Sequence, residues 1–319
     1  MNKYYIGIDV GGTNIKFGLL NESGTIIARN RLSTVSCASS KKKLINALTG
    51  IIHQLMNENN LKNNQMAGIG FGLPGLIDAE AGEVKILTNI FGWKNVPLKK
   101  MMEDATGIPT FIDNDVNVIT LGEWKYGAGR GYDNLVCITV GTGVGGGLIL
   151  NGEIYRGPGF TAGEIGHIPL NEKGPACNCG GSGCLEAYVG NRHLIAKAAK
   201  LFKNKNIRLE DVSELAKKEN SRAIEFWEEA GFHIGMGLVS VINVLNPQLI
   251  VIGGGVSNGL PFMKKSLEKT IQSRAMKIPA GMVKIVKAKL GDDAGLIGAM
   301  VLVKSQKVRS QKSEEKTIG

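Results

Sequence analysis

Apolar and polar positions divide the chain into short apolar runs and longer amphipathic segments. Two apolar runs, YYIGIDVGGTNIKFGLL near the start and NLVCITVGTGVGGGLILNG further on, are each interrupted by a glycine-rich turn. Each run predicts a strand, a turn and a second strand. The two copies lie about 130 residues apart and form a weak internal repeat. We therefore expect two related α/β lobes, each offering a loop of backbone N–H groups to a ligand between them.

The remaining pattern alternates strands with helices. Apolar runs at 65–72 and 109–112 predict further buried strands, and a helix is expected from about Asp113 to Tyr126. Later segments follow the same alternation, with helices expected at 191–202, 209–218, 221–245 and 293–304, and a buried strand at 248–252 after the stop signal Asn246-Pro247. This alternation is typical of the α/β class.

The length of the chain favours two lobes. With 319 residues and 34.0 kDa, the chain exceeds the size at which one hydrophobic core stops growing. We assign residues 1–117 to a smaller N-terminal α/β lobe, completed by the C-terminal helix 293–306, and residues 118–292 to a larger lobe. The polar tail, 307–319, is expected to be disordered.

Composition and charge argue against several classes of protein. The net charge of +10 comes from dispersed basic residues, apart from runs at 41–43 and 304–316, and so indicates a solvated surface without a nucleic-acid partner. Asp9 interrupts the first apolar run, and glycines crowd the uncharged stretch 134–152, so neither a signal peptide nor a membrane span is predicted. We expect a cytoplasmic protein with no membrane partner.

The second glycine turn matches a dinucleotide-binding fingerprint only in part. Gly141, Gly143 and Gly146 fit G-x-G-x-x-G, and Glu164 lies about where the ribose-binding carboxylate of this fingerprint falls. In a Rossmann unit the third glycine opens a helix, whereas here an apolar run leads into a hairpin turn at 151–152. This argues against a dehydrogenase. The chain has no G-x-x-x-x-G-K-[ST] motif, so a P-loop is not supported either.

The first glycine turn combines groups suited to phosphate and magnesium. It supplies a carboxylate for Mg²⁺, glycines that allow close backbone approach, a hydroxyl and a positive charge, from Asp9, Gly11, Gly12, Thr13, Asn14 and Lys16. A plain tight hairpin explains the glycines but not Asp9 and Thr13. A third cluster, 253–255, leaves flat space for an adenine and ribose, although a structural turn explains it nearly as well.

A cysteine and histidine cluster predicts a structural metal site. His167, Cys177, Cys179 and Cys184 provide four soft ligands, which suit tetrahedral zinc with no position left for water. A disulfide would require an oxidising compartment, which nothing in the sequence supports. Zinc in this loop, 167–184, is therefore the favoured interpretation.

Two carboxylates flank the cluster. Glu164 precedes His167 by three residues, and Glu186 follows Cys184 by two. A metal ion would fix both carboxylates, and a histidine that binds metal through one nitrogen still offers a second N–H. Together these groups form a rigid wall for hydroxyl groups. A sugar, with several neighbouring hydroxyls, is the substrate class that suits such a wall.

The segment DNDVN, at 113–117, marks the end of a buried strand and the start of a helix. Asp and Asn are common helix caps, but capping explains one of the four polar residues. At least one of Asp113, Asn114, Asp115 and Asn117 is therefore expected to face a ligand. A carboxylate here can serve phosphoryl transfer, in which positioning dominates and the attacking hydroxyl loses its proton late.

Together these motifs resemble the ROK family of bacterial sugar kinases and repressors, whose fold is the two-lobed actin-like and hexokinase-like ATPase fold, related to ribonuclease H. The resemblance covers nearly the whole chain. It rests on DVGGTNIK, FGLPG at 71–75, DNDVN, the glycine-rich VGTGVGGG running on to GEIGH at 163–167, and CNCGGSGCLE.

The resemblance implies a role for each matching residue. Asp115 would be the catalytic base, and sugar hydroxyls would be held by Gly75, Thr88, Asn89, Asn114, Asp115, Glu164, His167 and Glu186. ATP with Mg²⁺ would bind at the first turn, at Thr142 and Gly143, and at Gly254, Gly255 and Val256. Structural Zn²⁺ would fall on His167 and the three cysteines. The family also implies a homodimer or higher homo-oligomer.

Within the family, we expect an enzyme. The repressors carry a DNA-binding segment ahead of the first glycine loop, whereas here that loop begins at Asp9, and the base position holds Asp115. The segment TNIFGW, at 88–93, together with Glu164, His167 and Glu186, is similar to glucokinases. N-acetylmannosamine kinase and fructokinase or mannokinase remain alternatives, because they share nearly all of these residues.

Overall fold

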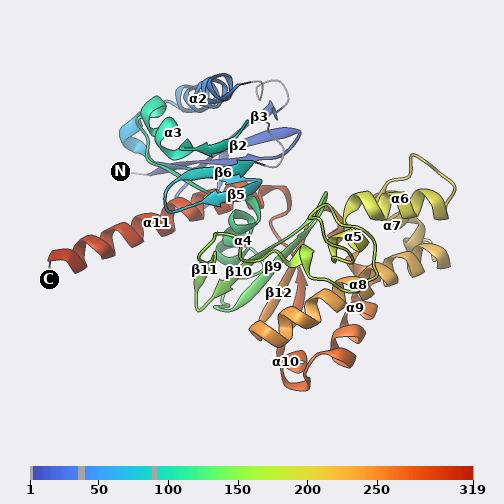
Figure 1. Ribbon diagram of the computed structural model, residues 1–319. Helices are drawn as coiled ribbons and strands as arrows, with labels where there is room; N and C mark the ends of the chain where they lie inside the picture. The colour runs from blue at the N-terminus through green and yellow to red at the C-terminus, as the bar shows by residue number, and fades with distance from the viewer. Residues whose placement is uncertain (1–2, 35–39, 88–91, 319) are drawn as a thin grey trace. The chain divides into compact units, whose positions relative to one another are not determined.

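The computed structural model describes residues 3–34, 40–87 and 92–318, with side chains as far as Gln306. Its internal contacts divide the chain into two units (Figure 1). Unit 1 comprises Met1–Arg130, Arg156–Thr161 and Asp292–Gly319, and unit 2 comprises Gly131–Tyr155 and Ala162–Gly291. The chain thus leaves unit 2 for six residues before it returns.

Unit 1 is built on a five-stranded mixed sheet. Its strand order is β3-β2-β1-β4-β8, with bounds β1 Tyr4–Val10, β2 Asn14–Asn21, β3 Ile26–Ser33, β4 Met66–Leu73 and β8 Thr110–Asn114. Strands β3, β2 and β1 pair antiparallel, whereas β1, β4 and β8 pair parallel. A smaller antiparallel sheet contains β5 Gly75–Asp78, β6 Glu83–Leu87 and β7 Lys94–Val96.

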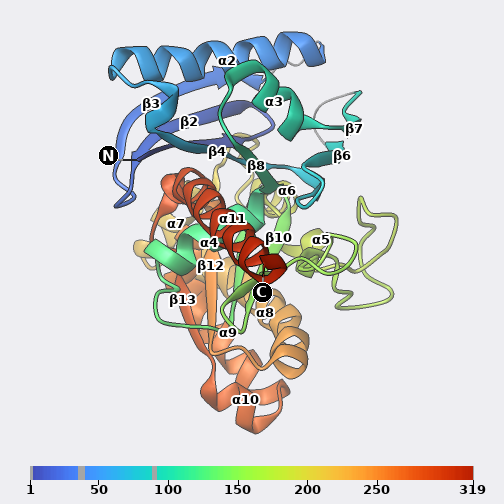
Figure 2. The ribbon, with the colours of Figure 1, turned by 90° about the vertical axis from the view of Figure 1, so that its left-hand side faces the viewer.

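Helices cover both faces of the larger sheet of unit 1. Figure 2 shows α2 (Lys41–Glu58) and α3 (Leu98–Thr106) on one side of the sheet. On the other side lie α4 (Asp115–Tyr126) and α11 (Ala294–Ile318). Apolar residues of α2 recur at helical spacing and are buried, which explains why it lies on the sheet. Helix α11 lies unusually close, because a Cβ atom on Gly7 or Gly70 would collide with the backbone of Leu296 or Ala299.

Unit 2 repeats the topology of the first sheet. Its order is β11-β10-β9-β12-β13, with bounds β9 Leu135–Val140, β10 Val144–Leu150, β11 Glu153–Tyr155, β12 Leu249–Gly253 and β13 Lys284–Lys287. The first three strands pair antiparallel and the last three parallel, as in unit 1. The internal repeat in the sequence therefore corresponds to a duplicated sheet.

The helices of unit 2 supply most of its core. They are α5 Glu186–Val189, α6 Asn191–Leu201, α7 Leu209–Lys217, α8 Ser221–Leu245, α9 Leu260–Arg274 and α10 Lys277–Met282. Helix α8 buries Trp227, Ile234 and Leu238 and ends at Asn246, whose left-handed backbone (φ 45°) precedes proline. Among the described helices, none combines the length and apolar character that a membrane span requires.

The predicted α/β class is confirmed, and the details differ at two places. The boundary expected after residue 117 falls inside α4, which packs against α11 and β4 and so belongs wholly to unit 1. Helix α11 continues to Ile318, through the tail expected to be disordered. Lys, Gln, Glu and Ser dominate this tail, and most of them are good helix formers.

Candidate functional site

Four candidate metal ligands lie together in unit 2. His167 ends the short helix η2 (Ile165–His167), and the three cysteines follow on one loop. The Cys177 Sγ lies 3.6 Å from the His167 Nδ1, the Cys179 Sγ lies 3.6 Å from the Cys184 Sγ, and all four ligand atoms lie within 4.8 Å of one another. Tetrahedral zinc, with bonds of about 2.3 Å to sulfur and about 2.0 Å to nitrogen, separates such atoms by about 3.5–3.8 Å. The donor set therefore fits a zinc ion.

The backbone of this loop is shaped for the cluster. The Cys177 N–H donates to the Gly181 carbonyl at 2.8 Å, and Gly183 adopts a left-handed conformation (φ 67°) in which any side chain would collide with the Asn171 carbonyl. Burial raises the pKa of the Cys184 thiol to about 12. A bound cation reverses that tendency, because a coordinating thiol is deprotonated.

His167 and Glu164 face one another beside the cluster. The histidine presents Nδ1 to Cys177, and its Nε2 lies 3.9 Å from the Glu164 Oε2. The side chains are 34% and 62% exposed, so a ligand can reach both. If Nδ1 binds the metal, Nε2 carries the proton and remains a donor. The expected hydroxyl-binding pair is therefore brought together.

Glu186, the third expected sugar ligand, is tied to the second glycine turn. It begins α5, and its Oε2 accepts the Val144 N–H at 2.9 Å. A Cβ atom on Gly143 would lie only 2.6 Å from the same oxygen, so a side chain there would displace the Glu186 carboxylate. The turn itself is closed by a hydrogen bond from the Gly141 N–H to the Gly143 carbonyl at 2.9 Å, and Thr142 is exposed at its tip.

Asn191 lies between the second glycine turn and the expected adenosine site. Asn191 donates its N–H to the Gly141 carbonyl at 2.8 Å, and its side-chain nitrogen is the nearest atom to a Cβ built on Gly255. Its Oδ1 is buried without a hydrogen-bond partner among the described residues. Val256, which is also expected to contact the adenosine, is fully buried. The sequence did not mark Asn191, because an Asn near a helix start is common.

The first glycine turn, in unit 1, places its predicted phosphate ligands at one tip. The Gly11 N–H donates to the Asn14 carbonyl at 2.9 Å, and Gly12 and Thr13 are exposed. The Thr34 hydroxyl donates to the Gly11 carbonyl at 2.8 Å and holds the turn from β3. The N–H groups of the tip are thus presented outward.

Asp9 lies at the end of β1, opposite Lys16 in the sheet register. Burial raises the pKa of the Asp9 carboxyl, and the charge of Lys16 acts in the opposite direction. The Lys16 Nζ also lies 3.5 Å from the Asp292 Oδ1. A half-buried carboxylate of this kind fits Mg²⁺, since a cation offsets the cost of its burial.

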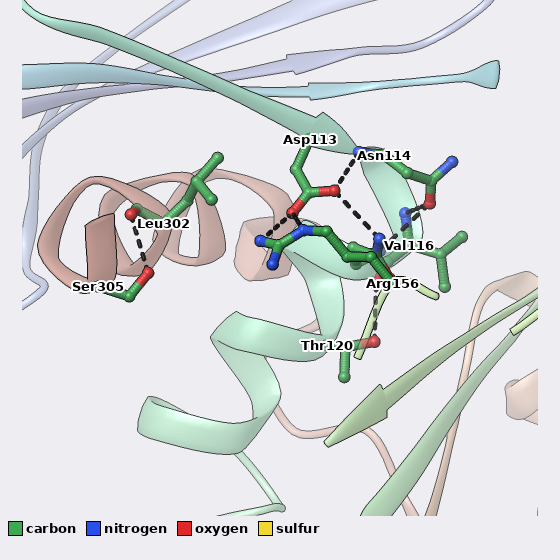
Figure 3. A network of polar contacts seen from close by, with 8 residues as sticks. Asp113, Asn114, Val116, Thr120, Arg156, Leu302 and Ser305 are labelled. Atoms are coloured by element: carbon green, nitrogen blue, oxygen red, sulfur yellow. Dashed lines mark hydrogen bonds and ion pairs between the residues drawn. The ribbon is translucent and has the colours of Figure 1, made fainter. Parts of the chain in front are cut away.

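The segment 113–117 joins β8 to α4, and Figure 3 shows its first two polar residues, Asp113 and Asn114. The four polar residues of the segment differ in exposure. Asp113 and Asn117 are buried, whereas Asn114 and Asp115 are half-exposed. Asn114 caps α4 by accepting the Val116 N–H at 2.9 Å and the Asn117 N–H at 3.3 Å. Its Nδ2 donates to the Gly75 carbonyl at 3.2 Å, which brings two expected sugar ligands together.

Arg156 is a partner of this segment that the sequence did not reveal. Its Nε and Nη2 donate to the Asp113 Oδ2 at 2.8 and 2.6 Å. The two residues are 43 positions apart, and a lone arginine after a strand carries no spacing signal. Two further expected sugar ligands, Thr88 and Asn89, lie outside the described residues.

Two sheets of one topology, each with a glycine hairpin suited to phosphate, define the duplicated actin-like class of α/β ATPase folds. The sequence model that represents the ROK family matches residues 5–306 of this chain. The chain therefore belongs to the ROK family. The chain is 34% identical to a glucokinase of Halalkalibacterium halodurans, over 98% of this chain and 99% of that protein. It is 29% identical to the xylose repressor of Bacillus subtilis, over 94% of this chain and 77% of the repressor.

The fold agrees with solved structures of the same family. A ROK family glucokinase from Streptomyces griseus, in complex with glucose and AMPPNP, matches with a TM-score of 0.75 and 28% identity, over 93% of this chain and 97% of that one. The α/β fold of this chain is therefore that of the ROK sugar kinases.

Proposed function

We propose that this protein transfers the terminal phosphoryl group of ATP to a hexose, most readily to glucose, giving glucose 6-phosphate. The observation that carries the proposal is Asp115, a half-exposed carboxylate at the first position of α4, in a segment fixed by hydrogen bonds. Its setting favours a base that is held in place. The glucokinase relatives support the same activity and the same donor.

Asp115 accepts the proton of the attacking sugar hydroxyl. The oxygen of that hydroxyl forms a bond to the γ-phosphorus of ATP, the bond between this phosphorus and the bridging oxygen breaks, and ADP leaves with that oxygen. Because the transition state is loose, proton transfer is late and the position of the hydroxyl matters most. The neighbouring Asn114 and Gly75 then hold the sugar beside the base.

The remaining hydroxyls are bound by the residues around the metal cluster. Glu164 and Glu186 accept hydrogen bonds, and the His167 Nε2 donates one. The Zn²⁺ ion takes no chemical part and serves as the brace of this loop, bound by His167, Cys177, Cys179 and Cys184. Loss of the ion is therefore expected to impair sugar binding and stability together.

ATP is held by both glycine turns. We assign its phosphates to Gly11, Gly12, Thr13, Asn14 and Lys16, and to Thr142 and Gly143. The adenosine is assigned to Gly254, Gly255 and Val256, with Asn191 as an additional contact. Mg²⁺ held near Asp9 supplies neutralising charge to the phosphates when bound.

A panel of sugars tests this proposal. Turnover with ATP is measured as kcat/KM for glucose, mannose, fructose and N-acetylmannosamine, and glucose is expected to give the highest value. A higher value for another sugar would change the substrate but leave the kinase assignment intact. Failure to phosphorylate any of the four would contradict the proposed function.

Similarity to a xylose repressor raises a second candidate, a sugar-responsive regulator of transcription. That function needs no base, whereas Asp115 is present and partly exposed. Sequence-specific binding of duplex DNA in a gel-shift assay, without phosphorylation of any sugar, would favour the regulator. On the resemblance alone we also propose a homodimer or higher homo-oligomer, which sedimentation equilibrium measures directly.

A further inference from the structure

Asp113 carries a charge in a position where charge is costly. The carboxylate lies at the end of β8 and its side chain is only 1% exposed. An isolated buried carboxylate is expensive, and it is tolerated only when charge and hydrogen bonds compensate it. Asp113 is the residue immediately before the capping Asn114, so whatever compensates it also acts on the start of α4.

Both oxygens of the Asp113 carboxylate accept hydrogen bonds, which offset the cost of burying its charge (Figure 3). Oδ2 accepts two hydrogen bonds from Arg156, whose side chain is 9% exposed. Oδ1 accepts the Asn114 N–H at 2.8 Å and the Asn117 Nδ2 at 3.0 Å. Oδ2 is therefore paired with the positively charged Arg156. Oδ1 holds the backbone of Asn114 and the side chain of Asn117, the residues on either side of Asp115 along the chain.

We infer that Arg156 is a positioning residue, which fixes the segment carrying Asp115 by pairing with Asp113. This inference rests on the proposed kinase function. Arg156 acts on this segment through Asp113, which accepts the Asn114 N–H. Without Arg156, the buried Asp113 carboxylate has lost its counter-charge, and a movement toward water would disturb the hydrogen bonds of Oδ1.

Arginine suits this task better than lysine. Its planar guanidinium donates from two nitrogens to one carboxylate oxygen here, and it keeps its charge when buried. The pair also anchors the segment Arg156–Thr161, which belongs to unit 1 although its neighbours in sequence belong to unit 2. The chain continues from this segment to Ala162 and Glu164, so the anchor precedes an expected sugar ligand by eight residues.

A set of variants separates positioning from simple stabilisation. In Arg156→Met the charge is lost, and we expect kcat to fall by about 10-fold to 100-fold while the KM for ATP changes less than about threefold. Arg156→Lys keeps the charge without the paired donors, and its kcat should lie between those of Arg156→Met and the wild type. Arg222→Met, at an exposed arginine, is the matched control and should be unchanged.

The decisive variant is the double change Asp113→Asn with Arg156→Met. It removes both charges but keeps a side-chain oxygen at position 113, so kcat should recover by at least about threefold over Arg156→Met. Thermal unfolding is measured for all variants. If Arg156→Met fails to fold, the double variant is compared with the wild type and should retain more than about one tenth of its kcat.

Several results would overturn the inference. They are an unchanged kcat in Arg156→Met, a folded double variant that is no faster than Arg156→Met, and a double variant that does not fold. The proposed function is tested separately by the wild type. If the wild-type protein phosphorylates hexoses and the variants show no such pattern, only the role of Arg156 is wrong.

Discussion

The two units share one sheet topology, yet their glycine hairpins obtain charged groups in different ways. In unit 1 the β1–β2 hairpin carries Asp9 and Lys16 at paired positions on its own strands. In unit 2 the β9–β10 hairpin has no charged residue, and its carboxylate is that of Glu186, which follows the metal-ligand loop. The two hairpins thus share one backbone arrangement. The carboxylate beside the second hairpin, however, comes from a residue more than 40 positions away in the sequence.

The largest effect is expected in unit 1, at Asp115, which follows strand β8 and begins α4. Asp115→Asn removes the proposed base, and kcat should fall by at least ~10²-fold with a smaller change in the KM for the sugar. Steady-state kinetics measures both constants. Asp104→Asn, at an exposed carboxylate, is the control, and near-normal turnover in Asp115→Asn would remove Asp115 from this role.

Metal removal should affect unit 2 more than unit 1. Chelation, or Cys179→Ser, breaks the four-ligand cluster, and a loss of about 3 kcal/mol would lower Tm by roughly 6–12 °C. Sugar affinity should weaken in parallel, because Glu164 and Glu186 flank the ligands. Calorimetry follows both quantities, and adding Zn²⁺, but not Mg²⁺, should restore the chelated protein. Full sugar affinity in metal-free protein would contradict the role of the cluster as a brace.

Substitution of Glu186 tests whether the second hairpin depends on this carboxylate. Glu186→Ala removes the acceptor of the Val144 N–H, and the KM values for ATP and sugar should each rise by about tenfold. Glu186→Gln keeps an acceptor oxygen and should change the KM for ATP less than Glu186→Ala does. Equal values of the KM for ATP in the two variants would show that the hydrogen bond does not matter for the nucleotide.

Asn191 should affect the nucleotide alone. Its unpartnered Oδ1 lies beside the expected adenosine turn, and loss of one hydrogen bond of about 1 kcal/mol in Asn191→Ala raises the KM for ATP about fivefold. The KM for glucose should stay within about twofold of the wild-type value. A comparable rise in the KM for glucose would instead indicate a general disturbance of unit 2.

The smallest effect concerns pH and the first hairpin. Burial raises the pKa of Asp9 above its ordinary value of 3.8, so the carboxylate gains its proton at a higher pH than an exposed Asp does. Affinity for Mg·ATP should therefore weaken as the pH falls toward this raised pKa and be retained above it. Titration calorimetry between about pH 5 and pH 8, the range in which protein stability tends to be highest, measures this change in affinity. The slope should disappear in Asp9→Asn.

The features that could be predicted from the sequence are those marked by signals within a short segment of the chain. Glycine turns between apolar runs located both hairpins, and the spacing of His167 and the three cysteines located the metal cluster, because these signals lie within short segments. The helix from Asp115 was found with a small error at its start. The short strands β5 to β7 were missed, since runs of three to five residues carry little periodicity.

Long-range partners could not be predicted from the sequence. Arg156 and Asp113 are far apart along the chain, and each is an ordinary residue in its own segment. The same applies to Asn191, which is recognisable only from its buried oxygen beside Gly255. The predicted boundary after residue 117 falls within α4, and the long-range packing of α4 against α11 assigns this helix to unit 1.

The close packing of α11 on Gly7 and Gly70 also has a consequence for protein synthesis. Strand β1 is translated long before α11, so the part of the sheet face that α11 covers beside α4 lacks this helix until the segments of unit 2 have been made. The segments of unit 2, by contrast, are all translated before α11. A growing chain that lacks α11 can therefore contain all segments of unit 2, together with a first sheet that still lacks one of its covering helices.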